Sequence, residues 1–401
     1  MEAPPVAAQQ FHEAMISRPN ASPRLRVLQC ITRLGLGGSE RVAFAIMDAL
    51  RAEIDFAVFT VHGTSGDAVG AGLQRELEAT QTPWFAGTAV PIKWGGMLTG
   101  AYALAQAIRK FRPDLVHFHT EIPESCGALL AQFYPPLAQI PVVRTIHNSI
   151  YWRYWPNIGR WCDRRLVHAH VACVSEAARD EFLRYRKDSG AGQSPAEPVV
   201  IYNGVNIRPR APRGSPHSSD RRRVLFAGRF EMQKGTDILC HALPLVRLPS
   251  GVSLGELTFM GHGAQAAQVS RLVANPPPGW AVTLCPPKAN LATVYSQFDL
   301  VVMPSRFEGL ALIAIEASLC GLPVVTTDAL GLREALPTDY PWRAQPNDAE
   351  SLAYSLSSAL MQTDRWEQAV HKAQQLALTR FSPKTMGDGY QQLYSFALKG
   401  S

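Results

Sequence analysis

The chain has 401 residues and a formal net charge of +6, from 39 Lys and Arg against 33 Asp and Glu. That length exceeds what one hydrophobic core usually supports and indicates two domains or more. The modest basic excess suits anionic ligands such as nucleotides, phosphates or acidic lipid headgroups, and we expect no nucleic-acid partner.

Cysteine usage and the N-terminal residues bear on the location of the protein. Seven cysteines are scattered singly, with no C-x-x-C pair, as expected of small apolar residues in a reducing compartment. Residues 1–23 have neither a basic start nor a continuous apolar core, so they predict a disordered tail and not a signal peptide or anchor. No later stretch reaches the roughly 18 unbroken apolar residues that a membrane-spanning helix needs. We therefore expect a cytoplasmic protein.

Short apolar runs alternate with stretches of helical period from residue 24 to residue 205. The runs that predict strands are 26–31, 54–61, 114–119, 142–147, 170–175 and 198–205. Between the first two, apolar residues follow the i, i+3, i+4, i+7, i+8 stripe of a helix packed on a sheet, namely Val42, Ala45, Ile46, Ala49 and Leu50. This alternation predicts parallel strands with crossover helices, which is a Rossmann-like α/β domain.

A Pro-, Ser- and Arg-rich segment, 206–223, has no apolar period and predicts a linker. Alternation resumes in a second Rossmann-like domain, 224–382, with strands expected at 224–228, 257–261, 281–285, 300–304 and 323–327. A last helical stretch, about 383–401, could pack on either domain, and we expect it to pack on the first. Two such domains place a ligand cleft between the carboxyl ends of two parallel sheets.

The Gly-rich loop "LGLGGSER" (34–41) follows the first predicted strand and opens the first predicted helix. A dinucleotide fingerprint fails here, because Glu40 stands where the third Gly belongs and the second strand ends without a ribose-binding acid. The pattern therefore disfavours a dehydrogenase. What remains is a small-residue turn at Gly37 and Gly38 whose backbone N–H groups can approach a ligand, or else a tight turn without one.

Two glutamates lie eight residues apart in "SRFEGLALIAIEA" (305–317). A helix is expected to begin near Leu310, with Glu308 in the loop at its start and Glu316 further along it. A diphosphate resting on the N–H groups of that helix start would leave a ribose beside Glu316, since a carboxylate accepts hydrogen bonds well from a vicinal diol. Glu308 would then meet the group carried by the far phosphate. If that group is a sugar, its hydroxyls are the natural donors to Glu308.

Charge balance for a diphosphate requires cations, and "GRFEMQKG" (228–235) supplies Arg229 and Lys234 directly after a predicted strand. The same pair would stabilise the charge that develops on a leaving diphosphate. The chain contains no D-x-D sequence, so we expect a mechanism without a metal or other cofactor. Each residue also has a structural alternative, as a solvated loop cation or a helix acid paired with an Arg. A glycosidase is disfavoured because nothing supplies carboxylates on both sides of a bond.

Taken in order, these motifs resemble the nucleotide-sugar glycosyltransferases called glycosyl transferases group 1, which have the GT-B fold and retain anomeric configuration. The resemblance rests on "GGSER" (37–41), "HFHT" (117–120), "NGV" (203–205), "GR" and "KG" around Arg229 and Lys234, "GHG" (261–263) and the E-x7-E motif. It implies that Arg229 and Lys234 bind the diphosphate, that Glu316 takes the ribose and that Glu308 approaches the sugar.

The resemblance also implies that His119 lines the reacting centre, although a structural histidine at a strand end is the alternative. Donor-binding positions that it implies are Gly37, Gly38, Gly309, Leu310 and Ala311. The sequence departs from the family where G-F-G is usual after the first Glu, because Gly309, Leu310 and Ala311 stand there. Asn206 replaces a common Asp, and Pro286 stands where a Gly is frequent.

Residues 151–165, "YWRYWPNIGRWCDRR", mix aromatic rings with arginines. Such a mixture suits a membrane surface or a lipid-linked phosphate acceptor, with Arg160, Arg164 and Arg165 as the cations. The alternative is a helix that packs its aromatic residues on its own sheet and exposes its arginines.

The sequence as a whole therefore predicts a retaining glycosyltransferase that moves a sugar from a nucleoside-diphosphate sugar, for example a UDP-sugar, to a glycan or lipid-linked acceptor. Bacterial cell-envelope polysaccharide or lipopolysaccharide synthesis is the expected setting, with possible peripheral contact at the inner face of an anionic cytoplasmic membrane. Two alternatives stay open: a nucleotide-sugar-binding protein of the same fold without turnover, and a GT-B nucleotide-sugar epimerase.

Overall fold

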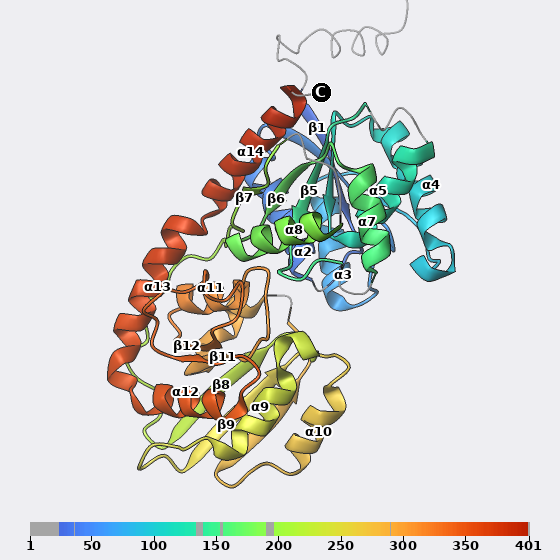
Figure 1. The fold of residues 1–401 in the computed structure, drawn as a ribbon. Coiled ribbons are helices and arrows are strands. Elements are labelled where there is room, and N and C mark those ends of the chain that lie inside the picture. The colour runs from blue at the N-terminus through green and yellow to red at the C-terminus, as the bar shows by residue number, and fades with distance from the viewer. Residues whose placement is uncertain are drawn as a thin grey trace, which may run out of the picture.

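The structure is a computed structural model that describes residues 24–35, 37–133, 139–152, 155–189, 196–288 and 290–399. The predicted tail, 1–23, lies outside the described residues. The described chain forms two α/β domains, one above the other in Figure 1. Each domain is built on a sheet in which every strand pair is parallel.

The first sheet has seven strands in the order β3-β2-β1-β4-β5-β6-β7. Their bounds are β1 Leu25–Ile31, β2 Ile54–Thr60, β3 Trp84–Ala86, β4 Leu115–His119, β5 Val142–Ile146, β6 His170–Cys173 and β7 Val199–Val200. The helices are α2 Gly38–Leu50, α3 Ala68–Ala79, α4 Gly96–Phe111, α5 Glu121–Phe133, α7 Pro156–Arg165 and α8 Glu176–Ser189.

Alternation along β1 explains how the first sheet is covered on both faces. Val27 and Ile31 pack into the cluster that contains α2 residues, whereas Leu28 and Cys30 pack into the cluster of α4 and α5. Successive side chains of a strand point to opposite faces, so an apolar run such as that of β1 needs helices on both.

The second sheet has six strands in the order β10-β9-β8-β11-β12-β13. Their bounds are β8 Arg221–Ala227, β9 Leu254–Met260, β10 Trp280–Cys285, β11 Leu300–Met303, β12 Val324–Thr327 and β13 Arg343–Ala344. The helices are α9 Thr236–Ala242, α10 Ala266–Ala274, α11 Leu312–Leu319, α12 Ala349–Met361 and α13 Trp366–Arg380. Single turns of 3₁₀-helix are η1 Ile92–Trp94, η2 Met232–Lys234, η3 Leu243–Leu245, η4 Leu291–Thr293, η5 Tyr295–Gln297 and η6 Thr363–Arg365.

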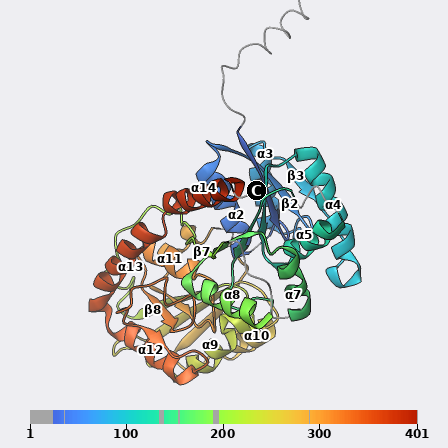
Figure 2. The same cartoon turned by 45° about the horizontal axis from the view of Figure 1, so that its top comes forward.

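The last helix, α14 (Pro383–Lys399), follows α13 out of the second domain and runs along the first, as Figures 1 and 2 show. Its buried residues Met386, Tyr390, Leu393, Tyr394 and Ala397 join the core cluster that contains α2 and β1. The chain therefore connects its two domains twice, through residues 201–220 and through α14.

Several element boundaries differ from the sequence-based expectations. The linker ends at residue 220, because Arg221–Arg223 pair with β9 as part of β8. The predicted strand at 198–205 pairs only at Val199–Val200, and two-residue β13 and three-residue β3 escaped prediction because they are too short for a period. Helix α11 begins at Leu312 and not near Leu310, since Ala311 has a ψ of 74° outside the helical range.

Candidate functional site

A cavity of about 580 Å³ lies between the two domains, at the carboxyl ends of their strands. The first domain contributes the loop after β1, the start of α2 and the ends of β4 and β5; the second contributes the loops after β8, β9, β10 and β11. Open α/β sheets place ligands at this edge because loops, and not packed helices, follow the strands there. The E-x7-E acids, the "GR" and "KG" cations and the Gly-rich loop all line this cavity.

Lys234 and Glu308 form a close ion pair across two loops of the second domain. The Lys234 Nζ atom lies 2.7 Å from Glu308 Oε1 and 2.8 Å from Oε2, and the Ser305 hydroxyl donates to Oε1 at 2.7 Å. Glu308 is buried, with an exposed fraction of 5 %. The carboxylate is thus held at a fixed point of the cavity with its charge balanced, next to the Gly309 backbone.

Arg229 also lines the cavity, but its side chain is 45 % exposed. Its guanidinium contacts Glu231 at 3.1 Å and Gln233 at 3.4 Å, both within its own loop. A half-exposed guanidinium held by one ion pair and one amide of its own loop can turn toward an anionic ligand at low cost, since exposed ion pairs contribute roughly 1 kcal/mol or less.

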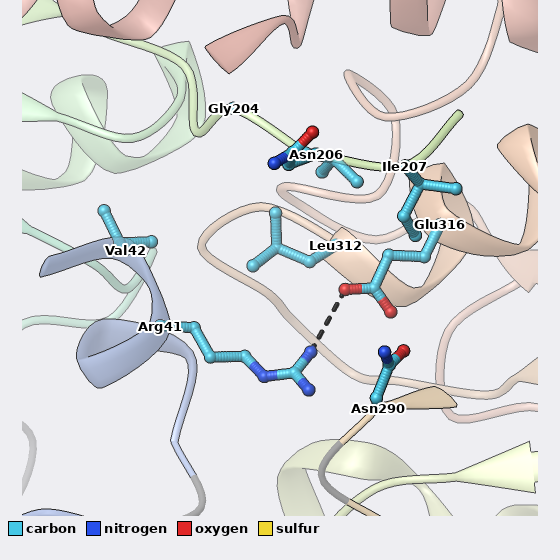
Figure 3. Close-up of a pocket in the computed structure, with 9 residues that line it drawn as sticks. Arg41, Val42, Gly204, Asn206, Ile207, Asn290, Leu312 and Glu316 are labelled. Atoms are coloured by element: carbon cyan, nitrogen blue, oxygen red, sulfur yellow. Dashed lines mark hydrogen bonds and ion pairs between the residues drawn. The ribbon is translucent and has the colours of Figure 1, made fainter. Parts of the chain in front are cut away.

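Glu316 is reached from both domains. Arg41 of α2 lies 3.2 Å from Glu316 Oε1, and the Tyr295 hydroxyl donates to Oε2 at 3.3 Å. Burial raises the pKa of Glu316, and the Arg41 charge and the Tyr295 hydrogen bond act in the opposite direction. Figure 3 shows the pair beside a smaller pocket of about 180 Å³, into which Asn206 and Asn290 also face.

The positions predicted to bind the donor all line the cavity, namely Gly37, Gly38, Gly309, Leu310 and Ala311, but their local surroundings differ. Gly37 precedes α2, where a Cβ would lie 1.9 Å from the Glu40 carboxylate, whereas a Cβ at Gly38 would meet open space. A Cβ at Gly309 would lie 1.8 Å from the His147 carbonyl oxygen. Gly309 therefore marks direct backbone contact between the domains. Leu310 and Ala311 line the cavity with little exposure.

His119 does not lie where the family resemblance implied. Its side chain is fully buried between Gln29 and His147 and does not line the cavity. His147, at the end of β5, lines the cavity instead. The reason is that β4 ends one residue before Thr120, whose φ of +73° turns the chain away, while β5 stops short of residue 147.

Two further carboxylates of the first domain line the cavity, and neither was predicted as a site residue. Burial raises the pKa of Glu40, and burial raises the pKa of Glu121 to about 7. The Trp152 backbone N–H donates to Glu121 Oε1 at 2.6 Å. Glu40 lies in the quoted "GGSER" run, but its sequence position gave no sign that its carboxylate folds back over Gly37.

The aromatic and basic segment divides into a buried part and an exposed part. Tyr151 and Trp152 are buried in the protein core, and Arg153 and Tyr154 lie outside the described residues. Arg164 and Arg165, at the end of α7, are exposed, and Arg160 is partly buried beside Asn157. The rings at 151 and 152 are thus part of the fold, while the cations at the end of α7 face solvent.

Metal and membrane features can be stated for the described residues only. Within them, no group of three or more His, Cys, Asp or Glu side chains has a metal-binding arrangement. Nor does the described part contain a helix that combines the length and apolar character needed to cross a membrane. All seven cysteines are unpaired.

The fold and the cavity define a GT-B protein: two parallel-sheet domains that face each other across a site built at their strand ends. Solved structures agree. Anabaena Alr3699/HepE in complex with UDP-glucose superposes with a TM-score of 0.73 at 21 % identity, covering 93 % of this chain and 100 % of that one. Sucrose-phosphate synthase from Thermosynechococcus elongatus superposes with a TM-score of 0.74 at 20 % identity, covering 94 % and 100 %.

The sequence matches Glycosyltransferase Family 4 over residues 36–208 and Glycosyl transferases group 1 over residues 221–362. The chain therefore belongs to the group 1 glycosyltransferases. Among curated relatives, the D-inositol 3-phosphate glycosyltransferase of Pseudarthrobacter chlorophenolicus is 38 % identical over 266 residues, 60 % of this chain and 61 % of that protein. The glycogen synthase of Mycobacterium tuberculosis is 27 % identical over 321 residues, 73 % and 71 % respectively.

Proposed function

We propose that the protein transfers a sugar from a nucleoside-diphosphate sugar to a glycan or lipid-linked acceptor with retention of configuration. The observation that carries the proposal is the Lys234–Glu308 pair at 2.7 Å, which places a cation and an acid side by side at the start of α11, in one cavity with Arg229 and Glu316. This is the charge pattern that a sugar diphosphate requires: cations for the phosphates and carboxylates for the hydroxyls at either end.

In this proposal the diphosphate lies between Arg229, Lys234 and the backbone N–H groups that open α11. Charge grows on that diphosphate as the sugar leaves, so the two cations stabilise the transition state more than the ground state. The two cations offset the diphosphate charge without a metal, which is why we propose a metal-independent reaction. Glu308 orients the transferred sugar through its hydroxyl groups.

The ribose would lie against Glu316. Arg41 now neutralises that carboxylate from the other domain, so binding of a ribose must either share Glu316 with Arg41 or displace it. UDP is the proposed nucleotide, since structural neighbours of the chain were solved with UDP and UDP-glucose. The pocket at Arg41, Asn206 and Asn290 offers donors and acceptors for a nucleoside.

Acceptor and location are proposed from the family and from the α7 surface. We assign the acceptor to the first-domain wall of the cavity and the reaction to cytoplasmic synthesis of envelope polysaccharide or lipopolysaccharide.

Arg160, Arg164 and Arg165 would touch an anionic bilayer. Their replacement by Gln should lower sedimentation with anionic vesicles, whereas the same charge loss at Arg247, Arg271 and Arg365 of the second domain should not. Equal binding of both variants and the wild type would contradict membrane contact through α7.

The direct test of the proposed function is thermal unfolding with UDP, GDP, ADP, NAD and no ligand. A ligand at a hundred times its dissociation constant adds about 2.7 kcal/mol to the free energy of unfolding. A shift with one nucleoside diphosphate and not with NAD supports the donor site, and a sugar panel on that base follows. Product analysis then separates transfer from an isomerised donor and from an unchanged donor. No shift with any nucleotide would remove the basis of the donor-site assignment.

A further inference from the structure

We propose that the outer face of η1 and α4 is a docking surface for an anionic lipid bilayer, in which Trp94, Leu98 and Tyr102 enter the headgroup region while cations of the same segment meet lipid phosphates. These side chains form the α4 surface. The inference deepens the proposed function, on which it rests, because it names the surface that would hold the enzyme beside a lipid-linked acceptor. It is independent of the α7 arginines, since its main contacts are apolar side chains of another helix.

Large apolar side chains gather in solvent at the start of α4. Trp94 is 76 % exposed, Leu98 is 63 % exposed and Tyr102 is 69 % exposed. Leu98 and Tyr102 lie one turn apart on α4, and Trp94 ends the 3₁₀ turn η1 just before it. Single exposed apolar residues are ordinary in soluble proteins, but a group of large ones marks an interaction surface.

The opposite face of α4 is occupied by the protein core. Leu104, Ile108 and Phe111 are buried and pack into the cluster that contains side chains of β1 and β4. The helix is therefore held on its sheet by one apolar face and presents further apolar side chains on the other. A partner can reach only that outer face, so a bilayer would be contacted from its surface and not crossed.

The charges of the segment match an anionic bilayer. Residues 79–113 contain no Asp or Glu. The cations of this stretch are all exposed, namely Lys93, Arg109, Lys110 and Arg112. An anionic bilayer presents phosphates above apolar chains, and Trp and Tyr side chains favour the boundary between these two layers. A surface with exposed rings, several cations and no acid therefore fits a lipid bilayer on both counts.

The α4 surface begins at the edge of the first sheet where the cavity lies. Neighbouring strands are parallel, so the carboxyl end of β3, which leads into η1, lies at the same edge as the ends of β4 and β5. Trp94 and Leu98 are therefore at the cavity end of α4. Figures 1 and 2 show α4 at the outer edge of the first domain, on the side opposite α14. A bilayer held here adjoins the domain to which we assign the acceptor.

The first test is sedimentation with vesicles of equal parts phosphatidylglycerol and phosphatidylcholine, and with vesicles of phosphatidylcholine alone. The wild type should bind the anionic vesicles more strongly. Replacement of Trp94, Leu98 and Tyr102 together by Ser should lower partitioning to the anionic vesicles by about tenfold or more, because less apolar surface is buried on binding. Absence of wild-type binding, or equal binding by this variant, would overturn the proposal.

The matched control carries the same number of Ser replacements at exposed apolar residues of the second domain, namely Leu245, Tyr354 and Met361. It should bind the anionic vesicles as the wild type does. All replaced side chains are exposed, so both variants should keep the thermal midpoint of the wild type without lipid. An equal loss of vesicle binding in both variants would contradict a specific role of α4.

The depth of Trp94 in the bilayer is a second test. Lipids with brominated acyl chains quench only those indole rings that reach the apolar layer. Vesicles that contain such lipids and phosphatidylglycerol should quench part of the wild-type fluorescence. Trp94→Phe should lose most of that quenching while it still sediments with the vesicles. Equal quenching of both proteins would show that another tryptophan enters the bilayer and would overturn the assignment to α4.

A second copy of this chain is the other occupant to test, by light scattering without lipid. A wild-type dimer that the Ser variant of α4 converts into monomers would overturn the lipid assignment, whereas equal masses support it. The thermal shift with a nucleoside diphosphate reports on the proposed function separately. It should be the same in the wild type and the Ser variant of α4, and its absence from both would contradict the donor site without changing the vesicle result.

Discussion

Glu308 and Glu316 share a cavity but have different partners, so their substitutions should separate. Glu308→Gln keeps the shape but removes the charge that faces the sugar, and we expect kcat to fall about 100-fold with the dissociation constant of the nucleotide changed less than about threefold. Glu316→Ala removes a charged hydrogen-bond acceptor for the ribose, worth about 1.5 to 3 kcal/mol, and should weaken nucleotide binding by about 10-fold or more. Calorimetric titration with steady-state kinetics measures both quantities. Small and equal effects of the two substitutions would contradict the assigned roles.

Glu121 should make the stability of the protein depend on pH. Burial raises its pKa to about 7, so between about pH 4.5 and pH 7 the unfolded chain loses this proton while the folded chain keeps it. The folded state then binds more protons, and the stability contributed at this site falls as pH rises through that window, by about 1.4 kcal/mol per unit at most. Glu121→Gln removes the effect.

The measurement is denaturant unfolding of wild type and Glu121→Gln from pH 4.5 to pH 8. The stability gained by the variant should grow with pH and level off above about 7. Glu53→Gln, at an exposed acid next to β2, is the control and should give a flat difference. A flat difference for Glu121→Gln would show that its carboxyl is not desolvated in the folded protein.

The sequence predicts a site residue when the strand and loop that carry it decide its position, and it fails when a contact from the other domain does. Lys234, Glu308 and Glu316 were predicted to lie at the cleft because each belongs to the segment after a strand with a readable apolar run, and all three line the cavity. His147 and Arg41 were not predicted as site residues because their contacts come from the second domain. Gly309 touches the backbone of His147, and Glu316 pairs with Arg41. His119 was misplaced because a turn of one residue, at Thr120, decides whether a strand-end side chain faces the cavity.

The fold was predicted more completely than the site for a related reason. Strands such as β1, β4 and β11 are buried on both faces, and their apolar runs are visible in any window. Strands β3 and β13 have three residues or fewer, and their pairing depends on longer neighbours already in place. No local pattern marks them, so their absence from the sequence-based expectation has a physical cause.

The loop between β11 and α11 is a contact element between domains as well as a ligand-binding loop. Gly309→Ala would force a Cβ to within 1.8 Å of the His147 carbonyl oxygen, a backbone atom that cannot rotate away. We expect the domains to separate locally, with kcat/KM reduced about 100-fold and the thermal midpoint changed by only a few degrees. Gly72→Ala on α3, where a Cβ meets open space, should change neither. Wild-type activity of Gly309→Ala would show that the two loops do not meet in the working enzyme.

A contact that lies away from the cavity also joins the two domains. Glu334, between β12 and β13, accepts hydrogen bonds from the backbone N–H groups of Glu176 and Ala177, each at 2.8 Å, and from the Tyr202 hydroxyl at 2.9 Å. A second-domain carboxylate therefore caps the start of α8 in the first domain, where the positive end of the helix favours an anion. Charged hydrogen bonds of this kind contribute about 1.5 to 3 kcal/mol each, so a few of them bias an open and closed equilibrium strongly.

Glu334→Ala removes all three bonds at once and should shift the ligand-free protein toward open arrangements. Small-angle scattering should then give a larger radius of gyration than for the wild type, and a saturating nucleoside diphosphate should reduce the difference, because Glu316 and Arg41 are brought together again only when the domains close. The donor KM should rise about tenfold, since binding must now supply the closure energy. Arg333→Ala is the control, as Arg333 is adjacent but pairs with Asp328 of its own domain at 2.9 Å. Identical scattering of Glu334→Ala and wild type would place the restraint on closure elsewhere, for example in the Arg41–Glu316 ion pair, in the Gly309 contact or in α14.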